Sequence, residues 1–514
     1  MDPYFDAEDV TTVSKSASPS SKHFFLATTI SIAVIALVFV SIELIGIFYA
    51  IDLLDVYVPE QREFQGNVNI FDIMEHLQEF EKIAQNFQSS RAMDLGYNAS
   101  VSYVVSQLSQ YPDYFPPDSI TQQVFPVVQV ENLEQPQFNQ LSPSVVDYEY
   151  EIDFQSISYS GSGDITANMI FVGAGCTTND YNSTTFTSGD IALALYTSDC
   201  STSERAQMSM QMQAGGLLIY NDEEGLFSSS AKNPVTFPVF ALSHEVGTEL
   251  MHLQTTGNVV SLRLFSSTQE VTSNTINIIV DTPGGDDTNV IVSGSHLDSV
   301  PAGPGINDNG SGSAANLEIA LQFARNNVNP TNKVRFAWWA AEELGLKGST
   351  YYLDNLSQTQ PTEVKNIAAN VNYDMLGSPN FVRGIYNGSE AQENIRPGCE
   401  AITQLYKDFF IQYGIAYSLT PFTGRSDYGP FLDYDIPAGG LFSGAEVKKT
   451  SAERTTFGGI SNASYDTCYH QSCDTVANIN REALDQMAKA AASVVYSLAM
   501  DSDLRSFLQT VKVQ

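Results

Sequence analysis

Two histidines and several acidic side chains in the second half of the chain have the residue types of a metal-dependent hydrolytic site. Asp308 follows His296 by twelve residues, and His470 lies near the end of the chain. Further carboxylates stand between them, at Glu342-Glu343 and at Asp374. Zinc takes nitrogen and oxygen ligands in proteins, so two imidazoles and three carboxylates provide ligands for two ions. One glutamate is then left over to act as a base.

The acidic residues beside these ligands are expected to have roles of their own. Asp298 comes two positions after His296 and is placed to orient the imidazole as a hydrogen-bond partner. The adjacent carboxylates of Glu342 and Glu343 repel each other unless a cation lies between them. With Glu343 on a metal ion and Glu342 against the attacking water, the repulsion is relieved and Glu342 becomes the general base.

Each of these residues alone has a simpler interpretation. His296 and His470 could be structural histidines, the glutamate pair could be a solvated helix start, and Asp374 could be a buried helix cap. Their coincidence favours the metal site, because His296 and His470 are the only histidines after His252 and both stand in metal-compatible contexts. His244 and His252 are interpreted as ordinary surface or packing residues.

The hydrophobic pattern around these residues predicts an α/β fold with a mixed, mostly parallel central sheet flanked by helices. From residue 274 onward, strand-like and helix-like runs alternate, which is typical of sheets that gather ligands at their strand ends. The predicted strands are 276–280, 290–294, 333–340 and 367–373, and the predicted helices are 314–324 and 349–355.

Two regions precede this part of the chain. Helices are predicted at 67–88 and 97–108, followed by strand-like runs between 123 and 160, in a block without a catalytic constellation. From 163 to 265, short strands and Gly/Ser turns predict a β-rich domain. Its predicted strands are 169–172, 191–196, 216–220, 235–240 and 259–264, and its predicted helix is 206–214. Whether this domain recognises substrate or serves as a spacer is open.

Length and charge limit the classes of function. A chain of 514 residues is longer than one hydrophobic core usually organises. Its length therefore predicts two soluble domains with accessory segments. Lys and Arg number 24 against 59 Asp and Glu, which gives a formal net charge of −35. Such a chain repels phosphate backbones, so we expect no nucleic acid partner.

Near the amino terminus, an apolar segment at 24–49 predicts a transmembrane signal anchor. Its core, 24–42, carries no charged residue and has the length of a membrane-spanning helix. Lys15 and Lys22 precede it and Asp52 and Asp55 follow it, which places a tail of residues 1–23 in the cytoplasm. The remainder would be lumenal or extracellular, in a vacuole or lysosome or at the cell surface. A cleaved signal peptide with secretion and a buried soluble helix are the alternatives.

Glycosylation sequons and cysteines fit the secretory route. Sequons stand at Asn98, Asn182, Asn355, Asn387 and Asn462. A sixth, at Asn309, lies inside the proposed metal loop. In an oxidising compartment Cys468 could pair with Cys473 around His470, and Cys176 with Cys200, which leaves Cys399 without a partner.

Taken in order, the motifs resemble those of the co-catalytic zinc aminopeptidases, in particular the Streptomyces-type secreted enzymes and yeast aminopeptidase Y. They are His-x-Asp at 296–298, Asp-Asn-Gly-Ser-Gly at 308–312, Glu-Glu at 342–343, Asn-Tyr-Asp-Met at 372–375, Gly-Arg-Ser-Asp at 424–427 and Cys-Tyr-His at 468–470. The region from 163 to 265 resembles an inserted protease-associated (PA) domain. The resemblance covers about 67 to 498 and implies the zinc exopeptidase fold.

The resemblance also implies a role for each residue. Asp308 would bridge two zinc ions, His296 and Asp374 would complete one, and Glu343 and His470 the other. Glu342 would be the general base. Tyr469 would donate a hydrogen bond to the oxyanion, and Arg425 would help line the place of the substrate's amino terminus. A cis peptide is expected between Asp308 and Asn309.

The sequence and this resemblance together predict a zinc aminopeptidase acting on peptides with a free amino terminus, and the resemblance implies a preference for large apolar, leucine-like residues. We expect the chain to be divided into five parts. After the tail and the anchor come an amino-terminal part of the peptidase domain at 50–162, the PA insertion at 163–265 and the catalytic domain at 266–514. Two alternatives are a membrane exopeptidase like glutamate carboxypeptidase II and a non-enzymatic receptor on a peptidase scaffold.

Overall fold

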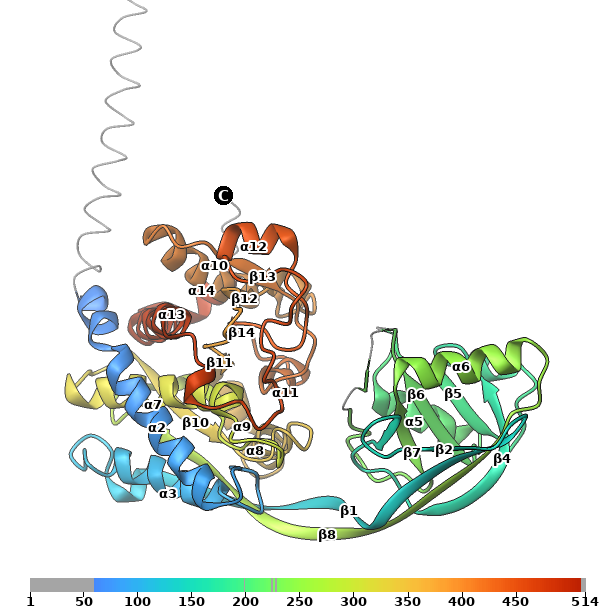
Figure 1. The fold of residues 1–514 in the computed structure, drawn as a ribbon. Helices are drawn as coiled ribbons and strands as arrows, with labels where there is room; N and C mark the ends of the chain where they lie inside the picture. The colour runs from blue at the N-terminus through green and yellow to red at the C-terminus, as the bar shows by residue number, and fades with distance from the viewer. Residues whose placement is uncertain (1–59, 198, 223–224, 227–228, 510–514) are drawn as a thin grey trace, which may run out of the picture. The chain divides into compact units, whose positions relative to one another are not determined.

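The computed structural model of the chain describes residues 60–197, 199–222, 225–226 and 229–509 (Figure 1). The predicted tail and membrane anchor, 1–23 and 24–49, lie outside these residues. Within the described part of the chain, no helix is both long enough and apolar enough to cross a membrane. The account below concerns residues from Phe64 onward, which form one compact unit.

The part of the chain from β8 onward contains the predicted mixed sheet, with strand order β13-β12-β14-β11-β9-β10-β8. Strands β9, β10, β11 and β14 form its parallel core, whereas β8 and β12 pair antiparallel with their neighbours β10 and β14. The strands are β8 (Ser261–Asp281), β9 (Asp286–His296), β10 (Asn332–Trp339), β11 (Ile367–Asp374), β12 (Gly384–Tyr386), β13 (Ser418–Thr420) and β14 (Ala438–Phe442).

Helices cover both faces of this sheet. They are α2 (Ile70–Asn86), α3 (Tyr97–Leu108), α7 (Gly312–Arg325), α8 (Lys347–Thr359), α9 (Pro361–Asn366), α10 (Arg396–Gln412), α11 (Tyr428–Asp433), α12 (Ser451–Phe457), α13 (Arg481–Met500) and α14 (Leu504–Gln509). Short turns of helix are η1 (Pro117–Ser119), η2 (Ile306–Ser311), η3 (Gly388–Glu390) and η4 (Val476–Asn478).

Alternation along the strands divides the core into two layers. Ile291 and Phe336 are buried in a cluster with α2, α3, α7 and α13. Val292 and Trp339 point to the opposite face and pack in a cluster with α8 and α11. Successive strand residues face opposite sides of a sheet, so strands buried on both faces are apolar throughout. The predicted strands and helices of this part are confirmed.

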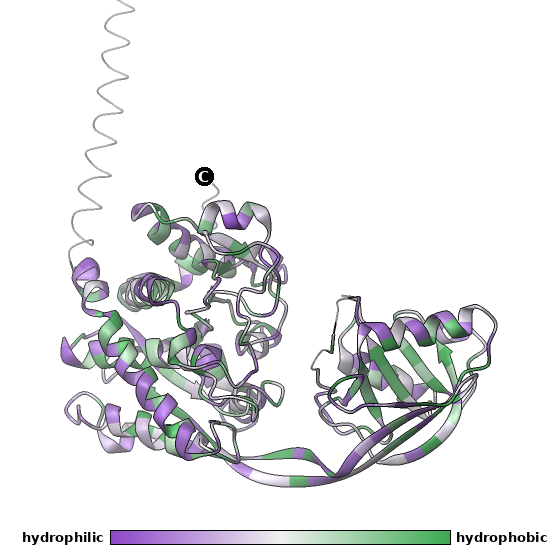
Figure 2. Ribbon diagram, viewed as in Figure 1, coloured by the Kyte–Doolittle hydropathy of each residue, from purple (hydrophilic) through white to green (hydrophobic). Residues whose placement is uncertain are grey.

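The PA region forms a second sheet, β4-β5-β6-β7-β3, that is parallel from β4 to β7. Its apolar strands are apparent in Figure 2. The elements are β3 (Phe154–Ser156), β4 (Gly163–Phe171), β5 (Ile191–Leu195), β6 (Gly216–Tyr220), β7 (Val239–Leu242), α4 (Thr178–Asn182), α5 (Thr202–Gln211) and α6 (His244–Thr255). Leu217 and Ile219 share a cluster with Ala206 of α5, whereas Leu218 shares one with Leu250 of α6.

Helix α6 was not predicted from the sequence. It contains Gly247, which weakens an isolated helix by about 1 kcal/mol relative to alanine. The structure shows why glycine stands there, since a Cβ at Gly247 would lie 2.1 Å from the ring of Tyr220. Tertiary packing against β6 therefore outweighs the local propensity.

A long antiparallel ribbon joins the two sheets. Strand β1 (Ile120–Ser142) pairs with β8 from Ile120 opposite Val280 to Ser142 opposite Ser261, and β2 (Val146–Tyr148) pairs with the end of β1. The sequence predicted two separate strands where β8 is continuous, and the expected division between 265 and 266 falls inside it. The middle of β8 is mostly polar and largely exposed, so it lacks the apolar face that marks a strand.

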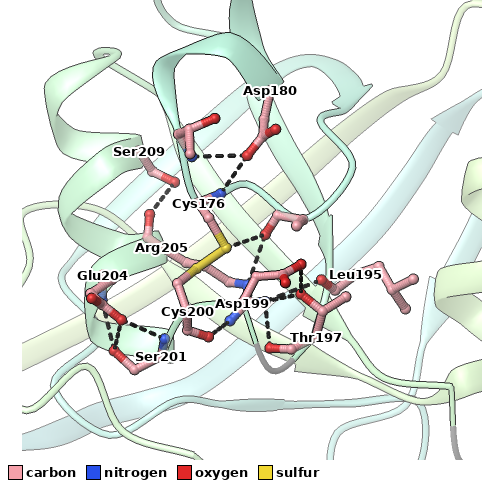
Figure 3. Close-up of a disulfide and its surroundings, with 12 residues drawn as sticks. Cys176, Asp180, Leu195, Thr197, Asp199, Cys200, Ser201, Glu204, Arg205 and Ser209 are labelled. Carbon is pink, nitrogen blue, oxygen red and sulfur yellow. Dashed lines mark hydrogen bonds between the residues drawn. A yellow bond between two sulfur atoms is a disulfide. The ribbon is translucent and has the colours of Figure 1, made fainter. Parts of the chain in front are cut away.

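The disulfide Cys176–Cys200 confirms one predicted pairing and lies in the PA region (Figure 3). Beside it, Arg205 is fully buried and donates hydrogen bonds to the carbonyl oxygens of Ala174 at 2.8 Å and Thr197 at 3.0 Å. Cys399 is a buried free thiol, as expected.

The core layers predict the effect of a truncation. Ile291 in β9 is fully buried, so Ile291→Ala should lower the free energy of unfolding by about 2–5 kcal/mol through lost apolar contact and a residual cavity. The side chain of Val124 in β1 is 57% exposed, so Val124→Ala should change the free energy of unfolding by less than about 0.5 kcal/mol. Equilibrium denaturation measures both values. Similar losses in the two variants would contradict this layering.

Candidate metal centre

Three neighbouring strands end at the candidate site. Strands β10, β9 and β11 are adjacent and parallel, so their carboxyl ends meet at one edge of the sheet. His296 is the last residue of β9 and Asp374 the last of β11, and Glu342 and Glu343 follow β10 after a short bend. The parallel register thus collects four of the predicted site residues from segments far apart in the sequence.

Two loops complete the site. Asp308 lies in the turn η2 before α7, and the Asp308–Asn309 peptide is cis, as the resemblance led us to expect. His470 lies in the loop closed by the Cys468–Cys473 disulfide, whose predicted pairing is confirmed. The φ angle of His470 is 57°, a left-handed conformation that is uncommon outside glycine and tends to mark functional sites.

The carboxylate of Asp308 lies between the two imidazoles. Its Oδ1 is 3.4 Å from His296 Nε2 and its Oδ2 is 3.1 Å from His470 Nε2. Asp374 Oδ1 is 3.4 Å from His296 Nε2, and Glu343 Oε2 is 3.1 Å from His470 Nε2. Two ligands at 2.0–2.1 Å from a tetrahedral ion are about 3.3 Å apart. The five predicted ligands therefore have the separations of two metal sites that share Asp308.

Unpaired polar atoms give a second indication of a cation. Within the described part of the chain, Glu343 Oε1, Asp374 Oδ1 and His470 Nε2 are buried without a hydrogen-bond partner. A buried polar atom without a partner is costly unless an ion or water satisfies it. Ligand atoms of His296, Asp308 and Glu343, and those of His296, Glu342 and Asp374, lie within 4.8 Å of one another. The residues present therefore fit a pair of divalent metal ions.

Glu342 differs from the ligands in position. Its Oε2 is 3.9 Å from His296 Nε2, which is farther than the four ligand separations. Burial, and then the nearby carboxylates of Glu343, Asp427 and Asp374, raise the pKa of Glu342 well above its usual value, although His296 acts in the opposite direction. A carboxylate with a raised pKa beside a metal centre is suited to accept a proton.

The two imidazoles lie in strongly acidic surroundings. Burial alone would lower the pKa of His296, but the carboxylates of Glu342 and Asp374 outweigh it and raise this pKa well above the usual value. His470 shows the same balance, with Glu343 and Asp308 raising its pKa against burial. The site therefore attracts positive charge strongly.

Asp298 positions the other residues and does not line the cavity. Its carboxylate accepts hydrogen bonds from the backbone N–H groups of Glu342 at 3.2 Å and Glu343 at 3.3 Å. Its Oδ1 also lies 3.6 Å from His296 Nδ1. The buried Asp298 carboxylate thus fixes the backbone of Glu342 and Glu343. His296 Nδ1 lies 3.2 Å from the backbone carbonyl oxygen of Asp298, so the hydrogen-bond partner of this imidazole is the backbone of Asp298 and not, as the sequence had led us to expect, its carboxylate.

Two further residues were missed although their motif was noted. Ser426 donates a hydrogen bond of 2.6 Å to Asp374 Oδ2. Asp427 is fully buried, and burial raises its pKa to about 7. Its Oδ1 accepts a hydrogen bond of 2.6 Å from the Ser349 hydroxyl. The Gly-Arg-Ser-Asp motif contained both residues, but only contacts in space show which one supports a ligand.

Asp474 and Asn309 fix the turn around Asp308. Asp474 accepts hydrogen bonds from the N–H groups of Asn307 at 2.8 Å and Asp308 at 3.0 Å, and burial raises its pKa to about 7. The Asn309 side chain donates to the Tyr373 carbonyl at 2.8 Å. Asn309 is fully buried in this role, although it stands in a glycosylation sequon.

A cavity of about 620 Å³, including the space open to solvent, leads to these residues. Its inner end carries Asp308, Glu342, Glu343 and Asp374. The other lining residues are mostly apolar or aromatic and include Met375, Tyr386, Pro421, Tyr428 and Phe442. A pocket with an apolar wall and a few converging polar groups is the usual form of a small-substrate site.

Arg425, Glu446 and Tyr469 also line the cavity. Arg425 Nη1 is 2.6 Å from Glu446 Oε1, and Arg425 Nη2 is 3.4 Å from the Tyr469 hydroxyl. The Tyr469 ring stacks on His470 with centroids 3.8 Å apart. Tyr469 thus lies beside the candidate metal centre, as predicted. The sequence assigned no role to Glu446, the ion-pair partner of Arg425.

The sequence is similar to known peptidases. The model of peptidase family M28 matches residues 277–495 and that of the PA domain matches residues 162–250. An aminopeptidase of Pseudomonas aeruginosa is 36% identical over 451 residues, which cover 84% of this chain and 81% of that protein. A leucine aminopeptidase 2 of Trichophyton rubrum is 39% identical over 356 residues, covering 68% of this chain and 70% of that protein.

The fold is also similar to solved structures. The aminopeptidase from Aneurinibacillus sp. strain AM-1 has a TM-score of 0.68 at 23% sequence identity and covers 86% of this chain and 97% of its own. A zinc aminopeptidase from Bacillus subtilis has a TM-score of 0.59 at 23% identity, covering 84% of this chain and 96% of its own. At these identities the similarity concerns the fold.

The contacts of Asp298 predict how it supports metal binding. Asp298→Asn removes a charged acceptor and turns an amide toward the N–H groups of Glu342 and Glu343. Loss of such a supporting partner typically lowers metal affinity by about 10–100-fold, which competition titration of Zn²⁺ against a chelator would measure. Asp113→Asn, at an exposed position, is the control and should bind as the unmodified chain does. Equal affinity in both variants would contradict the role of Asp298.

Proposed function

This chain belongs to peptidase family M28 and is an aminopeptidase of that family, and we propose that it removes the first residue of peptides with the help of two zinc ions. The position of Asp308 between His296 and His470 is the observation that carries this proposal. His296, Asp308 and Asp374 would hold one ion, and Asp308, Glu343 and His470 the other. Imidazole and carboxylate ligands suit zinc, and the ligand separations match a tetrahedral geometry.

When bound, two zinc ions lower the pKa of water and polarise the substrate carbonyl. The residues of the chain carry out the proton transfers. Glu342 lies beside the ligands and has a raised pKa, so it can accept a proton from the attacking water and pass it to the leaving amine. The Tyr469 ring stacks on His470 and lines the same cavity, so its hydroxyl would donate a hydrogen bond to the developing oxyanion.

The relatives, which are named aminopeptidases, support a substrate with a free amino terminus. The four carboxylates at the inner end of the cavity do not decide this by charge, because two bound zinc ions would balance them. The guanidinium of Arg425 is paired with Glu446, so Arg425 would line the mouth of the cavity without binding the ammonium group itself.

The aromatic wall supports a large apolar first residue. The rings of Tyr386, Tyr428 and Phe442 lie together, with centroid distances from Tyr386 of 4.5 Å to Tyr428 and 6.4 Å to Phe442. An apolar side chain gains free energy when it leaves water for such a wall. The names of the fungal relatives, leucine aminopeptidase 2, agree with a leucine-like preference.

Both sequence-based alternatives are weaker. A receptor on a peptidase scaffold would have no use for a complete ligand set, and here all five ligands, Glu342 and Tyr469 converge. An exopeptidase like glutamate carboxypeptidase II is weaker because the relatives are named aminopeptidases.

We further propose that residues 24–49 anchor the chain in a membrane with the catalytic part on the lumenal or extracellular side, with secretion after cleavage as the alternative. The two disulfides support an oxidising compartment. The chain would divide into the expected parts, with a PA insertion and a catalytic domain whose junction lies within β8.

The role of Glu342 predicts a separation of binding from turnover. Glu342→Gln keeps the shape of the side chain but removes its proton-accepting carboxylate, so zinc content should stay near that of the unmodified chain while kcat falls about 10²–10⁴-fold. Metal analysis and hydrolysis of leucyl-anilide measure the two quantities. Glu393→Gln, an exposed change of the same kind, should leave both unchanged. Full turnover by Glu342→Gln would remove this residue from the mechanism.

The proposed aminopeptidase activity predicts a preference between substrates. Leucyl-anilide should be hydrolysed, whereas the N-acetylated compound should fail because it lacks the ammonium group. A blocked dipeptide with an acidic carboxyl terminus should also be stable. Assays with and without a chelator measure these rates. Hydrolysis of the blocked dipeptide alone would instead support carboxypeptidase activity.

A further inference from the structure

Arg91 is a buried cation close to the proposed metal centre. It lies in the turn between α2 and α3, and its side chain is fully buried. Its guanidinium is 5.2 Å from the ring centroid of Phe80 in α2. The sequence interpretation placed no catalytic constellation in this block of the chain. A buried arginine needs partners for its five donors, so the groups that it contacts indicate its purpose.

The partners of Arg91 all belong to the loop 297–305. Its Nε donates to the carbonyl oxygen of Pro304 at 2.8 Å, and its two terminal nitrogens donate to the carbonyl oxygens of Leu297 and Gly305. This loop begins directly after His296 and ends three residues before Asp308. A single guanidinium therefore ties together both ends of the segment that connects two predicted ligands.

The neighbouring backbone strengthens this attachment. The Arg91 N–H donates to Ser299 Oγ at 3.0 Å, and Ser90 Oγ donates to the Val300 carbonyl at 3.0 Å. Gly305 has a φ angle of 60°, and a Cβ there would lie 2.3 Å from the Asp308 carbonyl oxygen and 3.3 Å from Arg91 Nη2. The loop thus passes between Arg91 and Asp308 with no room for a side chain.

We propose that Arg91 is a positioning residue that holds the loop 297–305 so that His296 and Asp308 meet at one metal ion. This inference rests on the proposed function, because it concerns the same metal centre. The fixed fork of a guanidinium can hold several carbonyls at once, whereas an ammonium group acts as a point charge. Hydrogen bonding, and not charge alone, is therefore the property that matters.

A purely electrostatic role would have the opposite effect on metal binding. The carboxylates of Asp298, Asp474, Asp308 and Glu343 act on Arg91, and although burial lowers its pKa to about 10, it stays positively charged at neutral pH. A buried positive charge near a metal site repels the metal ions. Removing the charge would therefore tighten zinc binding, whereas losing the position of the loop would weaken it.

Two variants of the full chain separate these effects. Arg91→Lys keeps the charge but cannot span the three carbonyls, and Arg91→Met removes both the charge and the donors. If Arg91 positions the loop, both variants should bind Zn²⁺ about 10–100-fold more weakly in competition with a chelator. In the metal-free proteins, the amide hydrogens of the loop 297–305 should exchange faster than in the unmodified chain.

Arg205 offers a matched control. It is also fully buried, donates to the carbonyl oxygens of Ala174, Thr197 and Cys200, and lies 4.8 Å from the ring centroid of Tyr196, but it belongs to the PA region. Arg205→Lys should reduce thermal stability as Arg91→Lys does, while zinc affinity and exchange in the loop 297–305 stay unchanged.

The outcomes are distinct. Unchanged zinc affinity in Arg91→Lys together with tighter binding in Arg91→Met would overturn the inference in favour of a charge effect. Equal loss of zinc affinity in Arg91→Lys and Arg205→Lys would also overturn it, because general destabilisation would then explain both. An unmodified chain that binds no zinc would overturn the proposed function, while exchange in the loop would still report on Arg91.

Discussion

The carboxylate of Asp308 faces two imidazoles at once, and much of the structure around it serves to keep it there. Its two oxygens point to His296 and His470, which come from a strand end and from a loop near the end of the chain. Buried charges in a water-poor site are costly unless they are paired and fixed by hydrogen bonds. The turn that carries Asp308 therefore depends on residues from other parts of the chain.

Three of the predicted ligands, Asp308, Glu343 and Asp374, are supported by hydrogen bonds with further residues. Ser426 bonds to Asp374, and Asp298 bonds to the backbone of Glu342 and Glu343. Asp474 bonds to the backbone at Asp308. In the proposed function, supporting hydrogen bonds of this kind would fix the geometry of the predicted ligands before a metal ion binds, which would lower the cost of ordering the site.

Parallel strands explain why the convergence of the predicted site residues could be expected from the sequence. His296 and Asp374 end apolar runs, and Glu342-Glu343 follows a third, so the assumption of a parallel sheet brings them to one edge. Only the structure could show the supporting contacts. The three carbonyl partners of Arg91 lie 206 to 214 residues away along the chain. Every residue has a backbone carbonyl group, so the residue types do not indicate these partners. The sequence held one weak indication that Arg91 has a role, since Lys82 and Arg91 are the only lysine or arginine residues between Arg62 and Arg205.

Two other parts of the fold, the middle of β8 and helix α6, were not predicted because their local sequence patterns do not indicate the structure that they adopt. The middle of β8 is mostly polar because the ribbon that it forms with β1 is largely exposed there, so hydrophobic alternation is lost. Helix α6 contains Gly247, whose missing side chain is explained by the close approach of Tyr220. In both places tertiary contacts decide the structure against the local pattern.

The central claim is that Asp308 lies between two zinc ions, and anomalous diffraction at the zinc absorption edge tests it most directly. Crystals of the zinc-loaded chain should show two peaks about 3.5–4 Å apart on either side of the Asp308 carboxylate, one near His296 and one near His470. A single peak, or peaks away from these residues, would contradict the account.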